Sequence, residues 1–367
     1  MRLALRELRR RPGRFVTAGA ILTLIAILLM FLGGLLDGLI RSSTAAIEAQ
    51  DADVIVYSES SQASFLRSRI EPDVRDAVAA LPEVAETGAL GVVQLGARVP
   101  GNGPRDLANT ALWGYELQPD GVPAPPADGE VYADEVLRAD GVEVGQELLL
   151  GPARTPITVI GWVDDTTYNG QGSLWANTAT WRRVLQENRP DAVLAEGVFQ
   201  ALDVRAADGT DPGALADAIE ANVQVIALTV PEAVDAIPGV SEQRNTFNQI
   251  LGVTLVIALV VIALFFALIT VERVALYGVL KAIGARSRTI FAGLVAQAVV
   301  VTAVAATIAA AAVIVIDLLI PPGGIPLYIS PGRIVLSVLL LLAAAVAGCA
   351  FSLRRVLRVD PASALGS

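Results

Sequence analysis

The sequence contains no histidine and only one cysteine. Without histidine, the chain has neither an imidazole base nor a histidine ligand for a metal. The one cysteine, Cys349, lies within an apolar run near the end of the chain, which disfavours a cysteine nucleophile or a zinc site. A single cysteine also excludes intramolecular disulfides, so each folded domain depends on its apolar core.

Lysine is just as scarce, because Lys281 is the only one in the chain. A P-loop places lysine between glycine and serine or threonine, whereas Lys281 stands between Leu280 and Ala282. The sequence also lacks the G-x-S-x-G pattern that carries the nucleophile of many hydrolases. We therefore expect a non-catalytic chain with no cofactor of its own, so that any ATP and magnesium would be bound by a partner subunit.

Four long apolar runs are present in a chain that is 54% hydrophobic, with a mean hydropathy of +0.58. A helix needs roughly 20 apolar residues to cross the hydrocarbon core of a bilayer. The runs predict transmembrane helices over 15–40, 247–271, 290–320 and 332–353. Buried helices of a soluble protein are the alternative, but four such runs would leave no polar helix face. We expect an α-helical membrane protein.

Basic residues flank these runs in the segments 1–14, 272–289 and 354–367. By the positive-inside rule, all three segments are expected to be cytoplasmic. Both termini then lie in the cytoplasm, and the protein is predicted to be a multi-pass protein of the bacterial plasma (inner) membrane.

The N-terminal segment leaves alternatives open. Basic residues before an apolar run are also typical of a cleaved signal peptide, but this run is long for one and no clear cleavage site follows, so a retained anchor is favoured. Leu3, Leu5 and Leu8 among the arginines fit either an amphipathic lead-in at the membrane surface or a simple basic flank.

Residues 41–246 form one long acidic segment, with 32 acidic and 13 basic residues and a net charge of −19. Strand-like and helix-like patterns alternate at both of its ends. A helix is predicted over 71–81, and another after Asp211, a typical N-cap that is followed by Pro212. The middle, roughly 105–197, is rich in Pro, Gly and Asp and contains strand-like runs. We predict a large extracytoplasmic α+β domain, with split βαβ halves around a mostly-β insertion.

Three groups of residues outside these patterns each admit a functional and a structural interpretation. Asp164 and Asp165 could serve acid–base chemistry or a cation, but solvated loop acids are favoured. Four tryptophans could line an apolar substrate site, but core packing is favoured. Asp37 and Asp317 lie near the predicted outer ends of spans one and three, where a transport pathway and simple hydration are the alternatives. The tryptophans are Trp113, Trp162, Trp175 and Trp181.

The loop between the second and third runs has apolar residues at helical spacing, Leu276, Leu280 and Ile283, and reads Gly278-Val279-Leu280-Lys281-Ala282-Ile283-Gly284-Ala285. This phrase resembles the coupling helix of ABC-transporter permeases of the MacB/FtsX type, which a cytosolic ATPase grips. The tail resembles the family's "D-P-A-x-A-L" ending at Asp360 and Pro361, and the order of one span, an external domain and three spans is also similar.

Within this family, the chain most resembles the short DevC-like permeases, which lack a fused ATPase. The resemblance also implies a set of residues that couple to the ATPase. The family usually has an acid two positions before the coupling glycine, where this chain has Leu276, so apolar burial would replace a salt bridge there. The implied coupling residues are Glu272, Arg273, Leu276, Gly278, Leu280, Lys281, Ala282, Ile283, Gly284, Ala285 and Arg286.

The function that the resemblance implies is that of a permease subunit that couples ATP hydrolysis by a separate ATPase to motion of the external domain. That motion would export or extract a hydrophobic, lipid or peptide substrate by mechanotransmission. The implied partners are two copies of a cytosolic ABC ATPase, a second permease copy, membrane lipid and an extracytoplasmic adaptor or hydrolase, with no nucleic acid. The alternatives are an FtsX-like regulator of a cell-wall hydrolase and a membrane-anchored scaffold or sensor without an ATPase.

Overall fold

The computed structural model describes residues 12–103, 105–272, 287–320 and 324–356. The contacts that residues make in space divide the chain into two compact units. One unit consists mainly of residues up to 38, 244–321 and 327 onward, and we call it the helical bundle. The other consists mainly of residues 39–243, and we call it the α/β domain.

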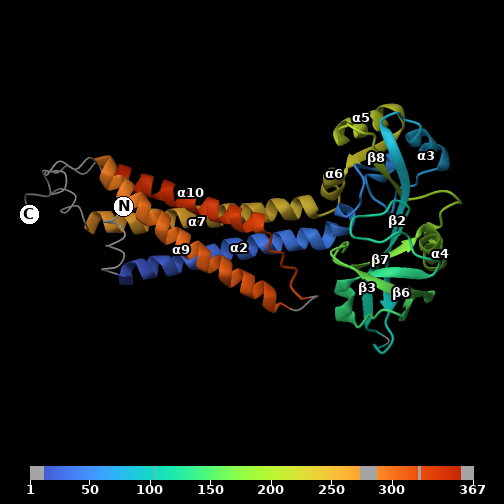
Figure 1. Ribbon diagram of the computed structural model, residues 1–367, viewed down its shortest axis with the longest axis horizontal. Helices are drawn as coiled ribbons and strands as arrows, with labels where there is room; N and C mark the ends of the chain where they lie inside the picture. The colour runs from blue at the N-terminus through green and yellow to red at the C-terminus, as the bar shows by residue number, and fades with distance from the viewer. Residues whose placement is uncertain (1–11, 104, 273–286, 321–323, 357–367) are drawn as a thin grey trace, which may run out of the picture. The chain divides into compact units, whose positions relative to one another are not determined.

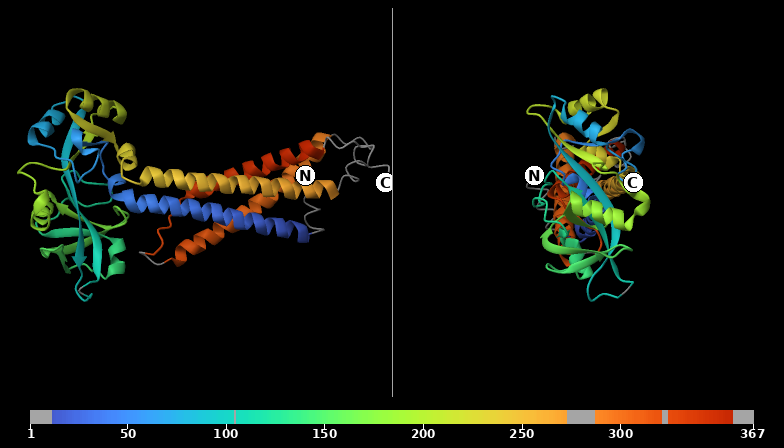
Figure 2. Two further views of the ribbon diagram at one scale, coloured as in Figure 1. Left: turned by 180° about the vertical axis from the view of Figure 1, so that it is seen from behind. Right: turned by 90° about the vertical axis from the view of Figure 1, so that its right-hand side faces the viewer.

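The helical bundle is built from α2 (Pro12–Glu48), α7 (Val240–Glu272), α9 (Ser287–Leu319) and α10 (Pro331–Val356). The four helices lie side by side (Figures 1 and 2), and each is long and apolar enough to cross a membrane. α2 extends past the expected end of its span at residue 40 and reaches Glu48. It continues because residues 41–48 contain neither glycine nor proline to end it.

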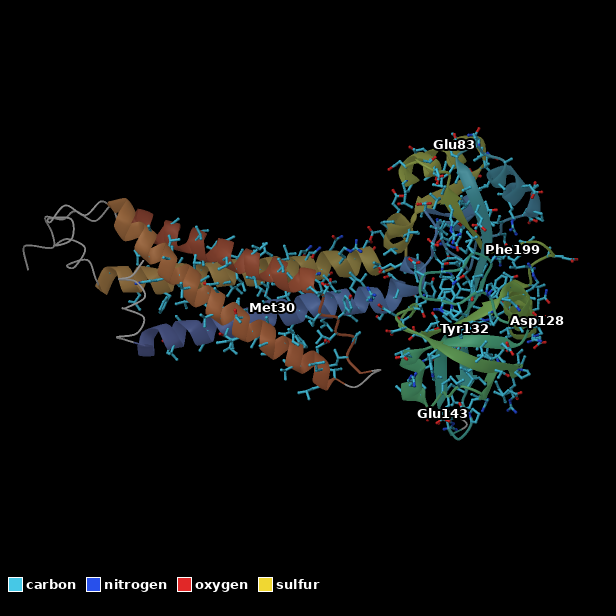
Figure 3. The ribbon with its side chains drawn as sticks, viewed as in Figure 1. Met30, Glu83, Asp128, Tyr132, Glu143 and Phe199 are labelled. Atoms are coloured by element: carbon cyan, nitrogen blue, oxygen red, sulfur yellow. The ribbon has the colours of Figure 1, made fainter. Side chains whose placement is uncertain are left out.

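Small side chains let the bundle helices approach closely. Its two core clusters contain eight buried alanines, and the side chain of Met30, which is 1% exposed, lies among the helices (Figure 3). Gly348 of α10 packs against the backbone of α7, because a β-carbon there would lie 3.1 Å from both the Ala263 nitrogen and the Leu259 oxygen. Such close packing of small residues is typical of helices that associate in a membrane.

The first half of the α/β domain comes from the two ends of its sequence. β1 (Val54–Ser58), α3 (Pro72–Ala79) and β2 (Val84–Arg98) form one strand–helix–strand unit. β8 (Ala201–Ala206), α5 (Pro212–Asn222) and β9 (Val225–Thr229) form the other. Their strands pair antiparallel in the order β2-β8-β1-β9, so the predicted fold class of split βαβ halves is confirmed.

The intervening residues form a closed β-barrel with one long helix. The ring runs β2-β3-β7-β4-β6-β5 and returns to β2, since β2 pairs with both β3 and β5. Two of the pairings, β3 with β7 and β4 with β6, are parallel. The elements are β3 (Leu107–Tyr115), β4 (Glu130–Asp134), β5 (Glu147–Leu150), β6 (Thr155–Val163), β7 (Gly172–Asn177) and α4 (Thr178–Asn188). Short helices are η1 (Glu59–Ser61), η2 (Glu135–Asp140), η3 (Pro190–Ala192) and α6 (Val230–Asp235).

The 15-residue strand β2 belongs to both halves of the domain. Its first part, from Val84 to Leu90, pairs with β8, and its second part, from Leu90 to Arg98, pairs with β3. The two halves therefore share one continuous sheet (Figure 1).

Successive side chains of the shared sheet point to opposite faces, and a hydrophobic core lies on each face. One face packs against α3 and α5, for example at Val78 and Ile219. The opposite face carries Tyr57, Leu90 and Trp113, and the ends of α2 and α7 that belong to this domain pack there. Those ends contribute Ala46 and Ile47 of α2 and Val240 of α7. A third core fills the barrel beneath α4.

Candidate functional site

The predicted coupling segment lies mostly outside the described residues. The structure describes α7 up to Glu272 and α9 from Ser287, with residues 273–286 between them left undescribed. Asp360 and Pro361 of the tail motif lie outside the described residues as well. The coupling role of Glu272, Arg273, Leu276, Gly278, Leu280, Lys281, Ala282, Ile283, Gly284, Ala285 and Arg286 thus remains a prediction.

The two helices that flank the coupling segment are each packed within the bundle. Ile262 of α7 shares a core cluster with Leu294 and Ala298 of α9, and the same cluster contains Leu22 of α2 and Ala345 of α10. The two helices that flank the predicted coupling segment therefore pack together with both other helices of the bundle.

One of the two acids singled out in the spans is paired. The guanidinium of Arg333, near the start of α10, binds the carboxylate of Asp37 in α2 through two hydrogen bonds, and the Arg333 Nε bond measures 2.7 Å. The two side chains are only 20% and 25% exposed. Next to this pair, the backbone nitrogen of Tyr328 donates to the Gly34 oxygen over 3.1 Å. Asp37 thus joins α2 to α10. This role differs from both the transport pathway and the simple hydration that the sequence suggested.

The end of α2 is bound to the α/β domain by the loop between β6 and β7, residues 164–171, which we call the clamp loop. The Ala46 nitrogen donates to the Thr167 oxygen (3.1 Å), the Asn169 nitrogen donates to the Ser43 oxygen (3.1 Å), and the Gly170 nitrogen donates to the Ser42 oxygen (2.8 Å). The guanidinium of Arg41 also forms an ion pair with the Asp165 carboxylate. Asp165, interpreted from sequence as a solvated loop acid, therefore contacts α2.

A buried polar network fixes the base of the clamp loop against β4 and β7. Asp134 Oδ2 accepts hydrogen bonds from the Thr166 nitrogen (2.7 Å) and the Thr166 hydroxyl (2.8 Å). The Thr166 hydroxyl in turn accepts a bond from Trp175 Nε1 (3.1 Å), and Ser173 Oγ donates to the Thr166 oxygen. Asp134 and Thr166 are 2% and 1% exposed. Burial raises the pKa of Asp134, and the bonds from Val136 and Thr166 oppose that rise.

Three of the four tryptophans lie in the core, as the favoured interpretation predicts, and the fourth packs against it. Trp113, Trp175 and Trp181 are fully buried, while Trp162 is half-buried beneath the guanidinium of Arg138, 4.2 Å from its ring centre. Trp113 stacks on Trp175 with ring centres 5.5 Å apart, and Tyr168 of the clamp loop meets Trp113 edge-on at 5.0 Å. These rings anchor the inner side of the clamp loop.

The α/β domain also contains an acid-rich pocket of about 450 Å³. Arg205 in its wall pairs with both Asp51 and Glu86 over 2.8 Å, and Glu116 pairs with Arg75 over 2.7 Å. These three acids therefore share the positive charges of two arginines. Among the described residues, no cluster of acids or cysteine has the arrangement of a metal site.

Sequence reasoning missed the clamp loop, although one signal was present. Asn169 and Gly170 both have positive φ, 49° and 72°, and Tyr168 and Gln171 pair on either side of them. An Asn-Gly pair is the strongest short-range signal for such a hairpin turn. No sequence signal indicated that this turn bonds to α2, more than 120 residues earlier.

Known proteins match the chain along nearly its whole length. Residues 15–222 match the MacB-like periplasmic core domain, and residues 248–361 match the FtsX-like permease C-terminal region. A permease of Staphylococcus haemolyticus that is named for hemin transport, HrtB, is 20% identical over 100% of this chain and 99% of its own length. The uncharacterized ABC transporter permease Rv2563 of Mycobacterium tuberculosis is 27% identical over 99% of this chain and 98% of its own length.

Two solved structures resemble part of the chain. The periplasmic region of MacB from Actinobacillus actinomycetemcomitans covers 52% of this chain and 94% of its own, with 10% identity and a TM-score of 0.35. The extracellular domain of YknZ, an ABC-type transporter from Gram-positive bacteria, covers 49% of this chain and 100% of its own, with 11% identity and a TM-score of 0.30.

Proposed function

Because the chain belongs to the ABC transporter permeases with a MacB-like periplasmic core domain and an FtsX-like C-terminal region, we propose that it transmits work from a separate cytosolic ATPase to its α/β domain. The segment 272–289 receives the ATPase, and the α/β domain lies on the other side of the membrane. Both termini are cytoplasmic. The complex contains two ATPase subunits and a second permease copy.

The observation that carries this proposal is the path of α2 and α7. Each helix runs unbroken through the residues at which the two units divide, 38 and 39 in α2 and 243 and 244 in α7. The ends of both helices belong to the core of the α/β domain. A continuous helix carries a displacement along its length as a rigid-body shift, so both are suited to move the domain.

The number of spans and the name of a relative support the substrate class that we propose. Four spans per copy are too few to build a wide polar channel, which favours a substrate collected at the membrane or outside it. HrtB is named for hemin, a largely hydrophobic molecule. We propose export or extraction of a hydrophobic, lipid or peptide substrate.

The proposed orientation is tested by labelling single cysteines in a Cys349→Ala background. Asp208→Cys lies in an exposed turn of the α/β domain, and Ser363→Cys lies in the tail. In intact spheroplasts, a membrane-impermeant maleimide is expected to label Cys at 208 at once and Cys at 363 only after lysis. The reverse pattern would contradict the orientation.

The coupling role is tested with Leu280→Asp. A charge in the apolar stripe of the coupling segment is expected to prevent docking, because burying an unpaired carboxylate costs several kcal/mol. The ATPase that co-purifies with the chain should then fall to the activity of the ATPase alone. Leu280→Met should retain stimulation, since it conserves volume and apolarity.

Val193→Asp provides the matched control for the added charge. Val193 is 53% exposed in the α/β domain, so the same substitution there should leave ATPase stimulation unchanged. Equal stimulation by Leu280→Asp and wild type would refute the coupling role. A chain that never stimulates an ATPase would favour the scaffold or sensor alternative.

A further inference from the structure

We propose that the clamp loop makes the end of α2 and the β-barrel one rigid body, and that Arg41, Asp165 and the Asn169-Gly170 turn are positioning residues of the transport cycle. The inference rests on the proposed function, because it assigns the contact through which the first span drives the α/β domain. It concerns residues 39–243, which form one compact unit.

The bonds to α2 fix both its position and its rotation. They involve the backbone of Ser42, Ser43 and Ala46, which lie within little more than one turn of the helix. Because their partners are three separate residues of the clamp loop, neither a slide along the helix axis nor a rotation about it leaves all three bonds intact. The ion pair of Arg41 with Asp165 adds a fourth point one residue earlier in α2.

The turn that donates two of these bonds is itself rigid. Asn169 and Gly170 occupy the left-handed region at φ 49° and 72°, and Tyr168 and Gln171 exchange two backbone hydrogen bonds of 3.0 and 2.9 Å. This is the geometry of a tight hairpin turn, which leaves few backbone degrees of freedom. The Asn169 and Gly170 nitrogens are therefore held in place to donate to α2, and no conformational entropy is lost to order them in each transport cycle.

The other side of the clamp loop cannot move without disrupting the barrel. Thr166 is bonded to Asp134 of β4 and to Trp175 of β7, and Trp113 of β3 donates to Ser173 over 3.2 Å. A shift of the loop would take away both Thr166 bonds to the buried Asp134 Oδ2 and leave the carboxylate only the bond from the Val136 nitrogen at Oδ1, which is costly in a protein interior. A polar network of this kind specifies one geometry, whereas apolar filling alone would permit sliding.

The test measures the distance between the end of α2 and the β-barrel. Spin labels at Glu48→Cys on α2 and Val144→Cys on the barrel, both exposed, are placed in a Cys349→Ala background. The full complex is reconstituted in nanodiscs, with labelled chain diluted by unlabelled chain. We expect the same narrow distance distribution by double electron–electron resonance with and without ATP and vanadate.

Gly170→Pro breaks the clamp. Proline lacks the N–H that bonds to Ser42 and cannot adopt a φ of 72°. The distance distribution should widen at least two-fold, while ATPase stimulation is retained because the coupling segment is untouched. The double variant Arg41→Gln/Asp165→Asn, which keeps the turn, should widen it by a smaller factor.

Gly209→Pro is the matched control, since Gly209 also has a positive φ (84°) but lies in an exposed turn of the same domain with open space around it. Tryptophan fluorescence reports whether each variant folds, because all four tryptophans lie in this domain. An unchanged distribution in folded Gly170→Pro, or a nucleotide-dependent shift in wild type, would overturn the clamp. Failure of the proposed function would instead appear as a wild-type chain that does not stimulate the ATPase.

Discussion

Replacing Gly114 by valine is expected to lower the unfolding free energy of the α/β domain by about 3 kcal/mol or more, the upper range for an overpacked core. Gly114 on β3 and Gly91 on β2 are cross-strand partners, and both face the indole of Trp181. A β-carbon on Gly114 would overlap the Trp181 β-carbon, and one on Gly91 would overlap its ring. The two glycines therefore form a flat slot in which α4 docks.

Trp181→Ala tests the same slot from the other side. Loss of a fully buried tryptophan is expected to cost about 3–5 kcal/mol. Because Gly114→Val and Trp181→Ala disturb one contact, their effects should be less than additive in the double variant. Denaturant unfolding followed by fluorescence of Trp113, Trp162 and Trp175 measures all three variants.

Gly103→Val is the control for adding a valine to a glycine of the same domain. Gly103 lacks a positive φ, and its added β-carbon would meet only the Asp106 side chain at 3.9 Å. The unfolding midpoint should stay close to that of wild type. Equal midpoints for Gly114→Val and Gly103→Val would show that Trp181 does not depend on the slot.

Asp203→Asn is expected to stabilise the α/β domain at pH 8 by about 5 kcal/mol relative to its effect at pH 4, at 1.36 kcal/mol per pKa unit. Asp203 lies on β8 between β1 and β2 and is 1% exposed. Burial raises its pKa to about 8, and Arg205 only partly opposes that rise. Among the described residues, its Oδ1 has no hydrogen-bond partner.

The sign of the pH dependence follows from proton binding. Between pH 4 and pH 8 the folded state keeps the Asp203 proton, whereas the unfolded state, with a pKa near 3.8, has released it. The stability contributed by Asp203 therefore falls as the pH rises through this window and levels off above it. Asparagine is neutral throughout, so Asp203→Asn should remove this slope.

Unfolding of the full chain in detergent, followed by tryptophan fluorescence at pH 4 and pH 8, measures the difference. Comparison of variant with wild type isolates Asp203 from Asp134, whose pKa burial also raises. Asp208→Asn, in an exposed turn, serves as the control. Parallel pH slopes for wild type and Asp203→Asn would mean that the carboxyl is ionised in the fold.

The local patterns of the sequence predict most of the elements of the fold. Asp211 caps α5 as expected and accepts bonds from the Gly213 and Ala214 nitrogens, and the helix predicted over 71–81 appears as α3 from Pro72 to Ala79. The four apolar runs are found as long helices. These features depend on residues close together in the chain, which a sequence pattern records directly.

The features that sequence could not predict depend on distant pairings. Closure of the barrel depends on the pairing of β2 with β5. The ion pair in the helical bundle joins Asp37 to Arg333, which is 296 residues away in the chain. The end of α2 at Glu48 was also missed, because the apolar pattern stops before the helix does. The coupling segment was identified by resemblance alone, and it stays a prediction.

The shared strand β2 has a mechanical consequence. Covalent main chain passes straight from the barrel into the four-stranded half, so the domain has no seam along which its halves could hinge. Stretching a strand is far stiffer than sliding packed side chains past one another. A force applied to the barrel should therefore be transmitted through β2 to the four-stranded half with little loss. Any molecule bound to the α/β domain would then be displaced by the whole domain.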